Sequence, residues 1–245
     1  MMGIPHNWPR AERVAPESPD YPPAALETFG AKAPALTLLG NRDLLNRRGI
    51  GFCGSRKASE KGMAAARDCA EQAVRRGFVV ISGNAAGIDF AAHHAALAAG
   101  GTTILVLPEG IDHFRVRKGL APEWDWERVL VISPFAPTAV WRASRAMMRN
   151  KLIIALSRAM IVVEAGEKGG TMHAGLNALK SRKPLFVINY HNVEELAPGN
   201  ARLLKEGALP LMKNRATGRA AFDRVVKSTD DAFMKERCDE QFALL

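Results

Sequence analysis

From Gly49 onward, short apolar runs alternate with longer amphipathic stretches, and this alternation narrows the folds open to the chain more than any other feature. The runs are rich in Val, Ile, Leu and Phe and are bounded by Gly, Pro or Ser, as strands buried on both faces of a parallel sheet are. Amphipathic stretches between such runs are typical of βα units. Six strands are therefore expected, at Ile50–Cys53, Phe78–Ser82, Thr102–Leu107, Val129–Ser133, Met160–Glu164 and Leu185–Ile188.

The stretches between these runs predict four helices, with Ser59 as a favourable N-cap of the first and Gly77 at its end. The least regular part of the core, Gly110–Trp126, is expected to be a loop at the rim. An α/β, Rossmann-like fold follows, with a mostly parallel sheet and helices on both faces. The predicted helices are Ser59–Arg76, Asp89–Ala99, Ala139–Leu156 and Thr171–Lys180.

The chain is expected to have one main domain with added segments at both ends. Residues 1–25 hold six of the fourteen prolines, which predicts an irregular arm. Apolar residues after Ala208 predict one or two short helices: Phe222, Val225, Val226, Ala232 and Phe233. The expected division is an N-terminal arm and lead-in over residues 1–47, the Rossmann-like domain over 48–212 and a helical tail over 213–245.

The composition is that of a folded globular protein, with 47% hydrophobic and 24% charged residues in 245 positions. No apolar run reaches the roughly 18 residues that span a bilayer. The first residues lack the apolar core of a secretion signal. We therefore expect a cytoplasmic protein with no membrane association.

The net charge of +9 and the pI near 9.8 favour a polyanionic partner, and nucleic acid above all. The three cysteines, Cys53, Cys69 and Cys238, form neither a CxxC pair nor a zinc-binding spacing. They are expected to be buried or incidental thiols. Neither a metal nor a cofactor is predicted.

The loop after the first predicted strand reads Gly54-Ser55-Arg56-Lys57. Ligands of open parallel sheets bind beyond the carboxyl ends of the strands, so function is expected in such loops. Glycine lets the backbone approach a ligand, arginine can hold a phosphate through two N–H groups, and the next helix adds its positive end. The alternative is a tight turn with two solvated cations, and the motif alone leaves both interpretations open.

Two further loops at the same edge carry paired glycines. Gly83 and Gly87 flank the loop after the second strand, and Gly169 and Gly170 precede Thr171 at the start of a helix. Backbone N–H groups at such positions can receive an anion, although neither loop is a GxGxxG or Walker motif.

Asp89 and His93 follow the second loop, and the structural explanation is favoured for each. Asp89 is then an N-cap, and His93 is a satisfied polar residue one helical turn later.

The predicted helix over residues 139–156 carries Arg142, Arg145 and Arg149 at i, i+3 and i+7, with Lys151 nearby. This spacing predicts a stripe of guanidinium groups that could follow a phosphate backbone. A solvated helix face is the alternative, but the stripe lacks the acidic partners that usually accompany one.

Three segments in this order resemble the DprA/Smf family of DNA-processing proteins: GSRK, SGNAAGIDFAAH and RNKLIIALSRAMIVVEA. The stretch YPPAALETFGAKAPALTLLGNRDLL resembles the lead-in to that family's first strand, and NARLLKEGALPL resembles its closing segment. The resemblance runs from Tyr21 to Leu211 and rests on several spaced motifs.

This resemblance implies an extended Rossmann fold of the SLOG superfamily that binds single-stranded DNA through its phosphates. It also implies a homodimer and transfer of DNA to a RecA-type recombinase during transformation, and the leading hypothesis is a DNA-binding protein without enzymatic activity. Lys57 is included in the candidate site because it belongs to the loop after the first strand, and Arg145 because it belongs to the arginine stripe. The positions that the resemblance implies are Gly54, Ser55, Arg56, Gly83, Gly87, Arg149, Asn150, Lys151, Gly169, Gly170 and Thr171.

The chain departs from the family pattern in places. Ala86 stands where the family commonly has arginine, GEKGGTMHA lacks the usual serine-rich form, and neither an N-terminal helical domain nor a winged-helix tail is evident. These departures favour an alternative, a nucleotide sensor or a regulator of a partner such as a toxin in a phage-defence pair.

A nucleotide hydrolase using Glu164 and Glu109 ranks last, because the PGGxGTxxE pattern of that branch is absent. No nucleophile elbow, HExxH or Walker A motif supports catalysis either.

Overall fold

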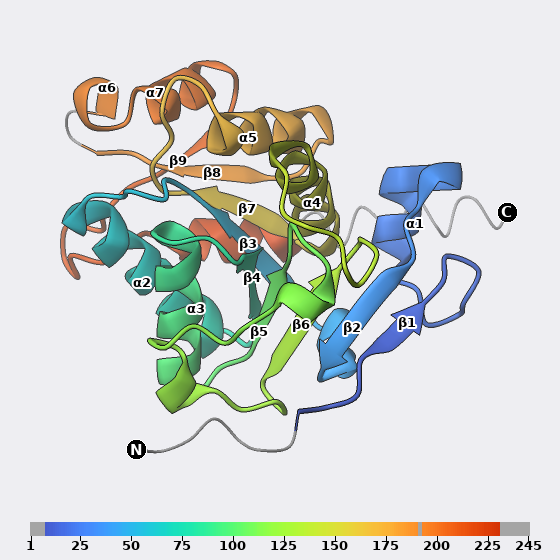
Figure 1. Cartoon of the computed structure of the whole chain (residues 1–245). Helices are drawn as coiled ribbons and strands as arrows, with labels where there is room; N and C mark the ends of the chain where they lie inside the picture. The colour runs from blue at the N-terminus through green and yellow to red at the C-terminus, as the bar shows by residue number, and fades with distance from the viewer. Residues whose placement is uncertain (1–7, 191–192, 231–245) are drawn as a thin grey trace, which may run out of the picture.

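The structure is a computed structural model that describes residues 8–190 and 193–230. A nine-stranded sheet runs through it in the order β1-β2-β6-β5-β4-β3-β7-β8-β9 (Figure 1). Strands β3 to β9 are parallel to one another, whereas β1 and β2 add an antiparallel flank. The strands are β1 (Glu12–Val14), β2 (Leu36–Gly40), β3 (Gly49–Cys53), β4 (Val79–Gly83), β5 (Thr103–Val106), β6 (Val129–Ser133), β7 (Ala159–Val162), β8 (Leu185–Ile188) and β9 (Leu209–Leu211).

The six predicted strands are β3 to β8, and every residue in them is buried. Strands β6 and β8 have the predicted bounds, and the others differ by one or two residues at one or both ends. Burial on both faces explains the continuous apolar runs, and the polar side chains of Ser82, Thr103 and Ser133 lie at or next to strand ends, where the Thr103 hydroxyl donates to Val80 O at 2.8 Å. Ser82 donates to Phe52 O at 2.8 Å, and Ser133 donates to Glu109 O at 2.7 Å.

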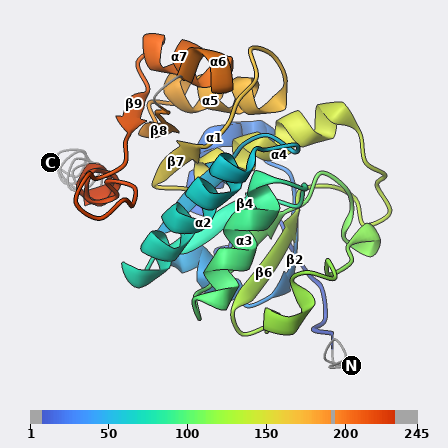
Figure 2. The same cartoon turned by 90° about the vertical axis from the view of Figure 1, so that its left-hand side faces the viewer.

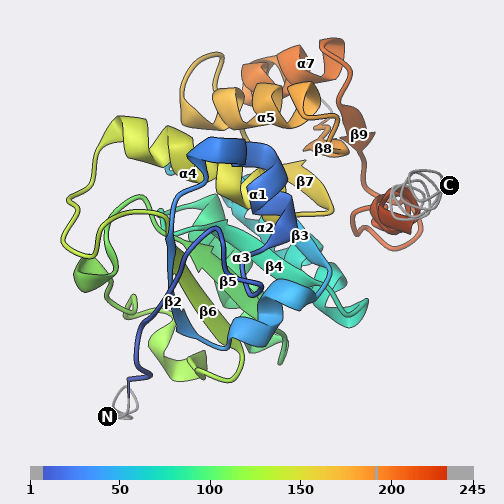
Figure 3. The ribbon, with the colours of Figure 1, turned by 90° about the vertical axis from the view of Figure 1, so that its right-hand side faces the viewer.

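Helices cover both faces of the sheet, so the predicted fold class is confirmed. Helices α2 and α3 lie over one face (Figure 2), and α1, α4, α5 and α7 lie over the other (Figure 3). Ser59 caps α2 as expected, accepting from Gly62 N at 3.0 Å. The helices are α1 (Pro23–Phe29), α2 (Glu60–Arg75), α3 (Ile88–Ala98), α4 (Ala143–Leu156), α5 (Gly170–Lys180), α6 (Val193–Leu196) and α7 (Pro198–Lys205), with short 3₁₀ turns at Gly30–Lys32, Arg42–Asn46, Ile111–His113 and Ala121–Glu123.

The prediction that residues 1–25 form an irregular arm is wrong for its second half. Strand β1 pairs with β2, and α1 begins at Pro23, where proline suits the first turn of a helix. Tyr21 is buried and donates its hydroxyl to Pro34 O at 2.8 Å. Prolines thus delimit short elements here. The pairing of β1 with β2 is not evident from the local sequence, because it depends on the neighbouring strand.

Helix α4 begins four residues later than predicted, at Ala143 instead of Ala139. Arg142 is extended, with φ −145° and ψ 148°. The residues before it are bound elsewhere, because Gly110 N donates to Ala139 O at 2.7 Å and Asp112 N to Pro137 O at 3.1 Å. The loop at Gly110–Trp126 is irregular as expected, and it buries Phe114, Leu120 and Trp124 against the sheet.

The segment after Ala208 contributes β9 and helical residues 223–230. Phe222 and Val225 are buried in the cluster that includes α2, which confirms their predicted apolar role. Ala232, Phe233 and Cys238 lie outside the described residues. The division of the chain near residues 47 and 212 stays a prediction.

Cys53 and Cys69 are buried free thiols, as expected. None of the helices in the described residues combines the length and the apolar character needed to cross a bilayer.

Candidate anion-binding site

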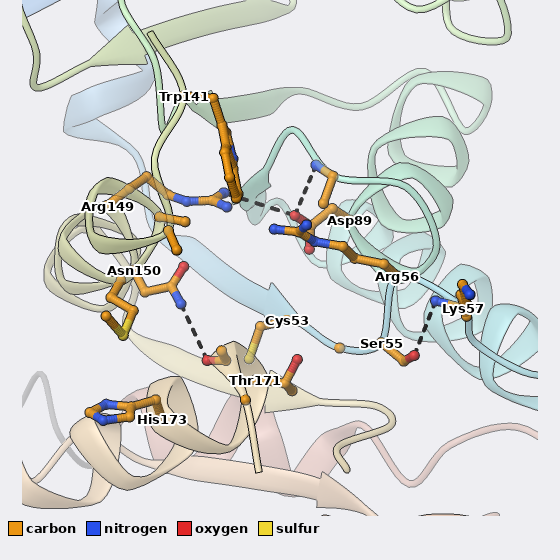
Figure 4. Close-up of a pocket in the computed structure, with 17 residues that line it drawn as sticks. Cys53, Ser55, Arg56, Lys57, Asp89, Trp141, Arg149, Asn150, Thr171 and His173 are labelled. Carbon is orange, nitrogen blue, oxygen red and sulfur yellow. Dashed lines mark hydrogen bonds and ion pairs between the residues drawn. The ribbon is translucent and has the colours of Figure 1, made fainter. Parts of the chain in front are cut away.

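A cavity of about 660 Å³ opens at the carboxyl ends of β3 and β7. The strand order reverses there, because the chain runs from β3 to β6 on one side and returns to β7 on the other side of β3. Doubly wound sheets bind ligands in the crevice at such a point. Figure 4 shows the residues around it: Cys53, Gly54, Ser55, Arg56, Lys57, Ala85, Asp89, Trp141, Ala143, Ala146, Met147, Arg149, Asn150, Gly169, Gly170, Thr171 and His173.

The loop after β3 forms one wall of the cavity. Ser55 Oγ accepts from Lys57 N at 3.1 Å, and Ser55 O accepts from Ile88 N at 3.2 Å. A side chain at Gly54 would collide with Ile88, so glycine is what allows the loop to pack against α3. The exposed side chains of Arg56 and Lys57 are thereby carried to the cavity.

The N-terminus of α5 forms the opposite wall. Gly169 precedes the helix with φ +106°, a conformation that suits glycine, and the space in front of Gly169 and Gly170 is open. The first N–H groups of a helix have no acceptor within it and lie at the positive end of its dipole. This wall therefore offers backbone donors to an anion, with the Thr171 hydroxyl beside them.

Arg149 supplies a buried guanidinium at the side of the cavity formed by α4. Its side chain is 6% exposed, its Nη1 donates to Val106 O at 3.0 Å, and Nη1 lies 3.8 Å from Asp89 Oδ2. Its Nε meets no acceptor among the described residues. A buried donor without an acceptor costs about 1–3 kcal/mol, so an anion oxygen at this position would be stabilising.

The cavity is positively charged overall. Arg56, Lys57 and Arg149 line it, against the single carboxylate of Asp89. Burial lowers the pKa of Arg149, and the carboxylates of Asp89 and Glu109 oppose that shift. A guanidinium remains protonated in proteins near neutral pH, so the site attracts anions.

Two side chains near the cavity, Cys53 and Glu164, are poorly placed to react. Burial, with a smaller contribution from Asp89, raises the pKa of Cys53 to about 12, so its thiol is a weak nucleophile at neutral pH. Glu164 accepts from the backbone N of Ser59 at 2.9 Å and from its hydroxyl, and it lies against Gly62 in the first turn of α2. It therefore holds the start of a helix and does not line the cavity. Within the described part of the chain, no cluster of three or more His, Cys, Asp or Glu is placed to hold a metal ion.

The cavity brings together nine of the thirteen predicted site residues, and Gly83 and Gly87 lie behind it. A side chain at Gly83 would collide with the Arg149 guanidinium, so this glycine makes room for that arginine. Gly87 has φ +74° and contacts the Ser55 and Arg56 backbone. The nine are Gly54, Ser55, Arg56, Lys57, Arg149, Asn150, Gly169, Gly170 and Thr171.

The predicted arginine stripe does not form as a single surface. Arg142 precedes the helix, Arg149 is buried, and Arg145 Nη1 donates to Val140 O while its guanidinium lies 5.6 Å from the Phe135 ring centroid. Lys151 is exposed but lies outside the cavity lining. The prediction failed because the helix starts late and because Arg149 turns toward β5 and Asp89.

His93 is a satisfied polar residue as expected, whereas Asp89 is not the predicted N-cap. His93 contacts Thr103 Oγ1 at 2.6 Å and Gly83 O at 2.7 Å, and burial lowers its pKa to about 4. Asp89 lies one residue inside α3, after the Gly87 cap and Ile88, accepts from Ala85 N at 3.2 Å and pairs with Arg149.

Sequence reasoning missed Trp141, Met147 and His173 at the cavity. Trp141 is 49% exposed and its ring centroid lies 5.7 Å from the Arg56 guanidinium carbon. The available sign of a binding role was a tryptophan next to Arg142. It was missed because residues 139–156 were predicted to be one helix, which placed Trp141 inside that helix.

The fold and the site define a Rossmann-like protein with a positively charged crevice at its switch point. Residues 12–218 match the family of the DNA recombination-mediator protein A, and the chain belongs to that family. The resemblance to DprA/Smf proteins is thereby confirmed.

Several named relatives support this assignment. The chain is 34% identical over 171 residues to the DNA processing protein DprA of Streptococcus pneumoniae, covering 69% of this chain and 60% of that protein. It is 30% identical over 171 residues to the Bacillus subtilis DprA, covering 69% and 58%. The Escherichia coli Smf protein is 30% identical over 203 residues, covering 82% and 54%. The chain thus spans somewhat more than half the length of these relatives.

Solved structures show the same fold. The crystal structure of Streptococcus pneumoniae DprA has a TM-score of 0.73 at 30% identity, covering 82% of this chain and 71% of that one. A structure of the Helicobacter pylori DprA, which concerns its single-stranded DNA binding, has a TM-score of 0.71 at 24% identity and covers 82% and 91%. The second likeness supports the fold alone.

Proposed function

We propose that this protein binds single-stranded DNA and holds its phosphates in the cavity between the β3 loop and α5, without catalysing a reaction. The observation that carries the proposal is the buried Arg149, whose Nε lacks an acceptor in the described structure beside a wall of helix N–H donors. Arg56 and Lys57 add exposed cations to the cavity lining. Together they offer a phosphate buried and backbone donors beside exposed charges.

A single strand fits this arrangement better than a duplex. The donors lie inside a crevice instead of along a broad basic surface, because the arginine stripe on α4 does not form. A flexible strand can lower its backbone into such a crevice, whereas the phosphates of a duplex are fixed on a wide cylinder.

Family membership supports two finer parts of the proposal, that the protein acts as a homodimer and that it presents bound DNA to a RecA-type recombinase. A toxin partner or a small-nucleotide signal is the competing function, and the experiment below separates them. Gel filtration with light scattering tests the dimer.

Fluorescence anisotropy tests the proposal with a labelled single strand, its duplex and a competing mononucleotide at two salt concentrations. Arg56→Ala should weaken single-strand binding about tenfold and reduce the salt slope by about 1, since one phosphate contact is lost. Arg75→Ala is the matched control, because it removes one exposed arginine from the far end of α2.

Preference for the single strand, with loss in Arg56→Ala and none in Arg75→Ala, supports the proposal. Binding of the mononucleotide in preference to any oligonucleotide would favour the sensor. Absence of binding to all three probes would contradict nucleic-acid binding and direct attention to a protein partner.

A further inference from the structure

Trp141 presents a large indole at the edge of the cavity, and its exposure is unusual for so apolar a side chain. It is 49% exposed, its neighbour Val140 is 54% exposed, and Met147 in α4 is 43% exposed. Trp141 and Met147 both line the cavity. An apolar wall beside a charged crevice marks a place where an apolar part of a ligand can lie.

The segment that carries Trp141 is held in place by its backbone. Gly110 N donates to Ala139 O at 2.7 Å, Ala139 N donates to Ala136 O at 2.9 Å, and His113 Nε2 lies 3.1 Å from Thr138 O. A side chain at Gly110 would collide with the backbone at Pro137, so the two segments are in close contact. Trp141 therefore follows a loop that is anchored by hydrogen bonds. Because this segment is already ordered, it loses less conformational entropy when a ligand packs on the indole.

The Arg56 guanidinium lies over the Trp141 ring, with its carbon 5.7 Å from the indole centroid, and both side chains line the cavity (Figure 4). The cations and helix donors that suit a phosphate thus lie next to an aromatic ring. A nucleotide carries a phosphate and a flat base at neighbouring positions, and unpaired bases stack on tryptophan with about 1–3 kcal/mol per base.

We propose that Trp141 is a stacking platform for one unpaired nucleobase, with Met147 packing at its edge. This inference rests on the proposed function. It adds a contact with the nucleobase, the part of the ligand by which a single strand differs from a duplex. In a duplex the base faces are covered by their neighbours, so only an unpaired base can lie on the indole. The phosphate donors then set affinity for the backbone, and Trp141 adds to the preference for single strands that the crevice gives.

The experiment compares two labelled oligonucleotides of equal length, one with bases and one with abasic sites throughout, so that the phosphates are the same. Wild-type protein should bind the strand with bases about tenfold more tightly than the abasic strand. Trp141→Ala should bring the two affinities within about twofold of each other by weakening only the first, and Trp141→Phe should retain most of the difference.

Trp8→Ala is the control, because Trp8 is 41% exposed but packs on Phe114 and Trp126 and does not line the cavity. It should leave both affinities unchanged below its own melting temperature. Equal binding of both strands by the wild type, or an equal loss for both strands in Trp141→Ala, would overturn the stacking role while leaving phosphate binding intact. Failure of the wild type to bind either strand would instead overturn the proposed function itself, and the stacking role with it.

Discussion

Glu164 and Arg149 are both charged and buried at the carboxyl edge of the sheet, but their surroundings differ. Glu164 accepts from the backbone N and hydroxyl of Ser59 and lies 3.4 Å from the Tyr190 hydroxyl. Arg149 has one hydrogen bond to Val106 O, a long ion pair with Asp89 and an Nε without an acceptor among the described residues.

This difference separates a structural charge from a binding charge. A buried charge whose hydrogen-bond partners all come from the protein needs no ligand. The hydrogen bonds of Glu164 are of this kind, and they fix the start of α2. Arg149 keeps a donor available beside open helix N–H groups, which is where an anion gains most. The sequence did not distinguish the two, since the strand end that holds Glu164 and the helix that holds Arg149 give no sign of which charge has its partners within the protein.

The largest expected effect comes from Arg149→Ala, which leaves Asp89 buried without its cation. Removal of one partner of a buried pair costs about 3–5 kcal/mol of unfolding free energy, to be measured by urea denaturation. The double variant Asp89→Asn with Arg149→Met should lose less than the single variant, because no uncompensated charge remains. A single variant as stable as wild type would mean that the pair is not an interaction of the folded state.

His93 is a third buried polar group, and its burial disfavours the protonated form. Its folded pKa of about 4 lies below the ordinary value of 6.5, so the unfolded chain takes up the proton first as pH falls. Its contribution to stability is complete above pH 6.5 and declines by roughly 3 kcal/mol toward pH 4.

Urea denaturation across this pH range checks the prediction for His93. The variant His93→Gln should have a flatter stability profile than wild type, whereas the neighbouring His94→Gln should follow the wild-type profile. Identical profiles for wild type and His93→Gln would contradict the assignment.

Glu164→Gln should reduce stability by about 1–2 kcal/mol, because weaker acceptor contacts replace charge-assisted ones at the start of α2. Its affinity for single-stranded DNA should stay within about twofold of wild type, since electrostatics at a distance from the phosphates is screened. Thermal melting and anisotropy measure the two quantities. A large loss of affinity with little loss of stability would reverse the contrast between Glu164 and Arg149.

Arg145→Ala should have the smallest effect on binding, a change of less than about threefold, as expected for a charge outside the contact. Its guanidinium is engaged with Val140 O and the Phe135 ring instead of lining the cavity. Fluorescence anisotropy measures the single-strand affinities of Arg145→Ala and Arg56→Ala side by side. An effect as large as that of Arg56→Ala would restore the stripe on α4 as a DNA-binding surface.

The parallel part of the sheet was predictable because strands such as β6 and β8 are buried on both faces and so appear as unbroken apolar runs. Strands β1 and β9 were not, since each has three residues and depends on a neighbour for its hydrogen bonds. Helix α4 was placed too early because its apparent first turn is bonded to the Gly110 loop, a contact between distant segments.

The candidate site was predictable where glycine and cations follow a strand, as at Gly54 and Arg56. It was not predictable where the role depends on burial or long-range pairing. Asn200 illustrates the limit: it is fully buried and binds Ala165 N, Val163 O and Ile188 O, yet its sequence context resembles that of a surface residue.

The central claim is that the Arg149 Nε donates to a phosphate of bound DNA. The most direct measurement is the NMR signal of that Nε–H group before and after saturation with a single-stranded oligonucleotide, assigned through Arg149→Lys. We expect a marked downfield shift and slower exchange with water for Arg149, and no change for Arg128, whose Nε already donates to Asp125 at 3.2 Å. An unchanged Arg149 signal under saturating DNA would contradict the account.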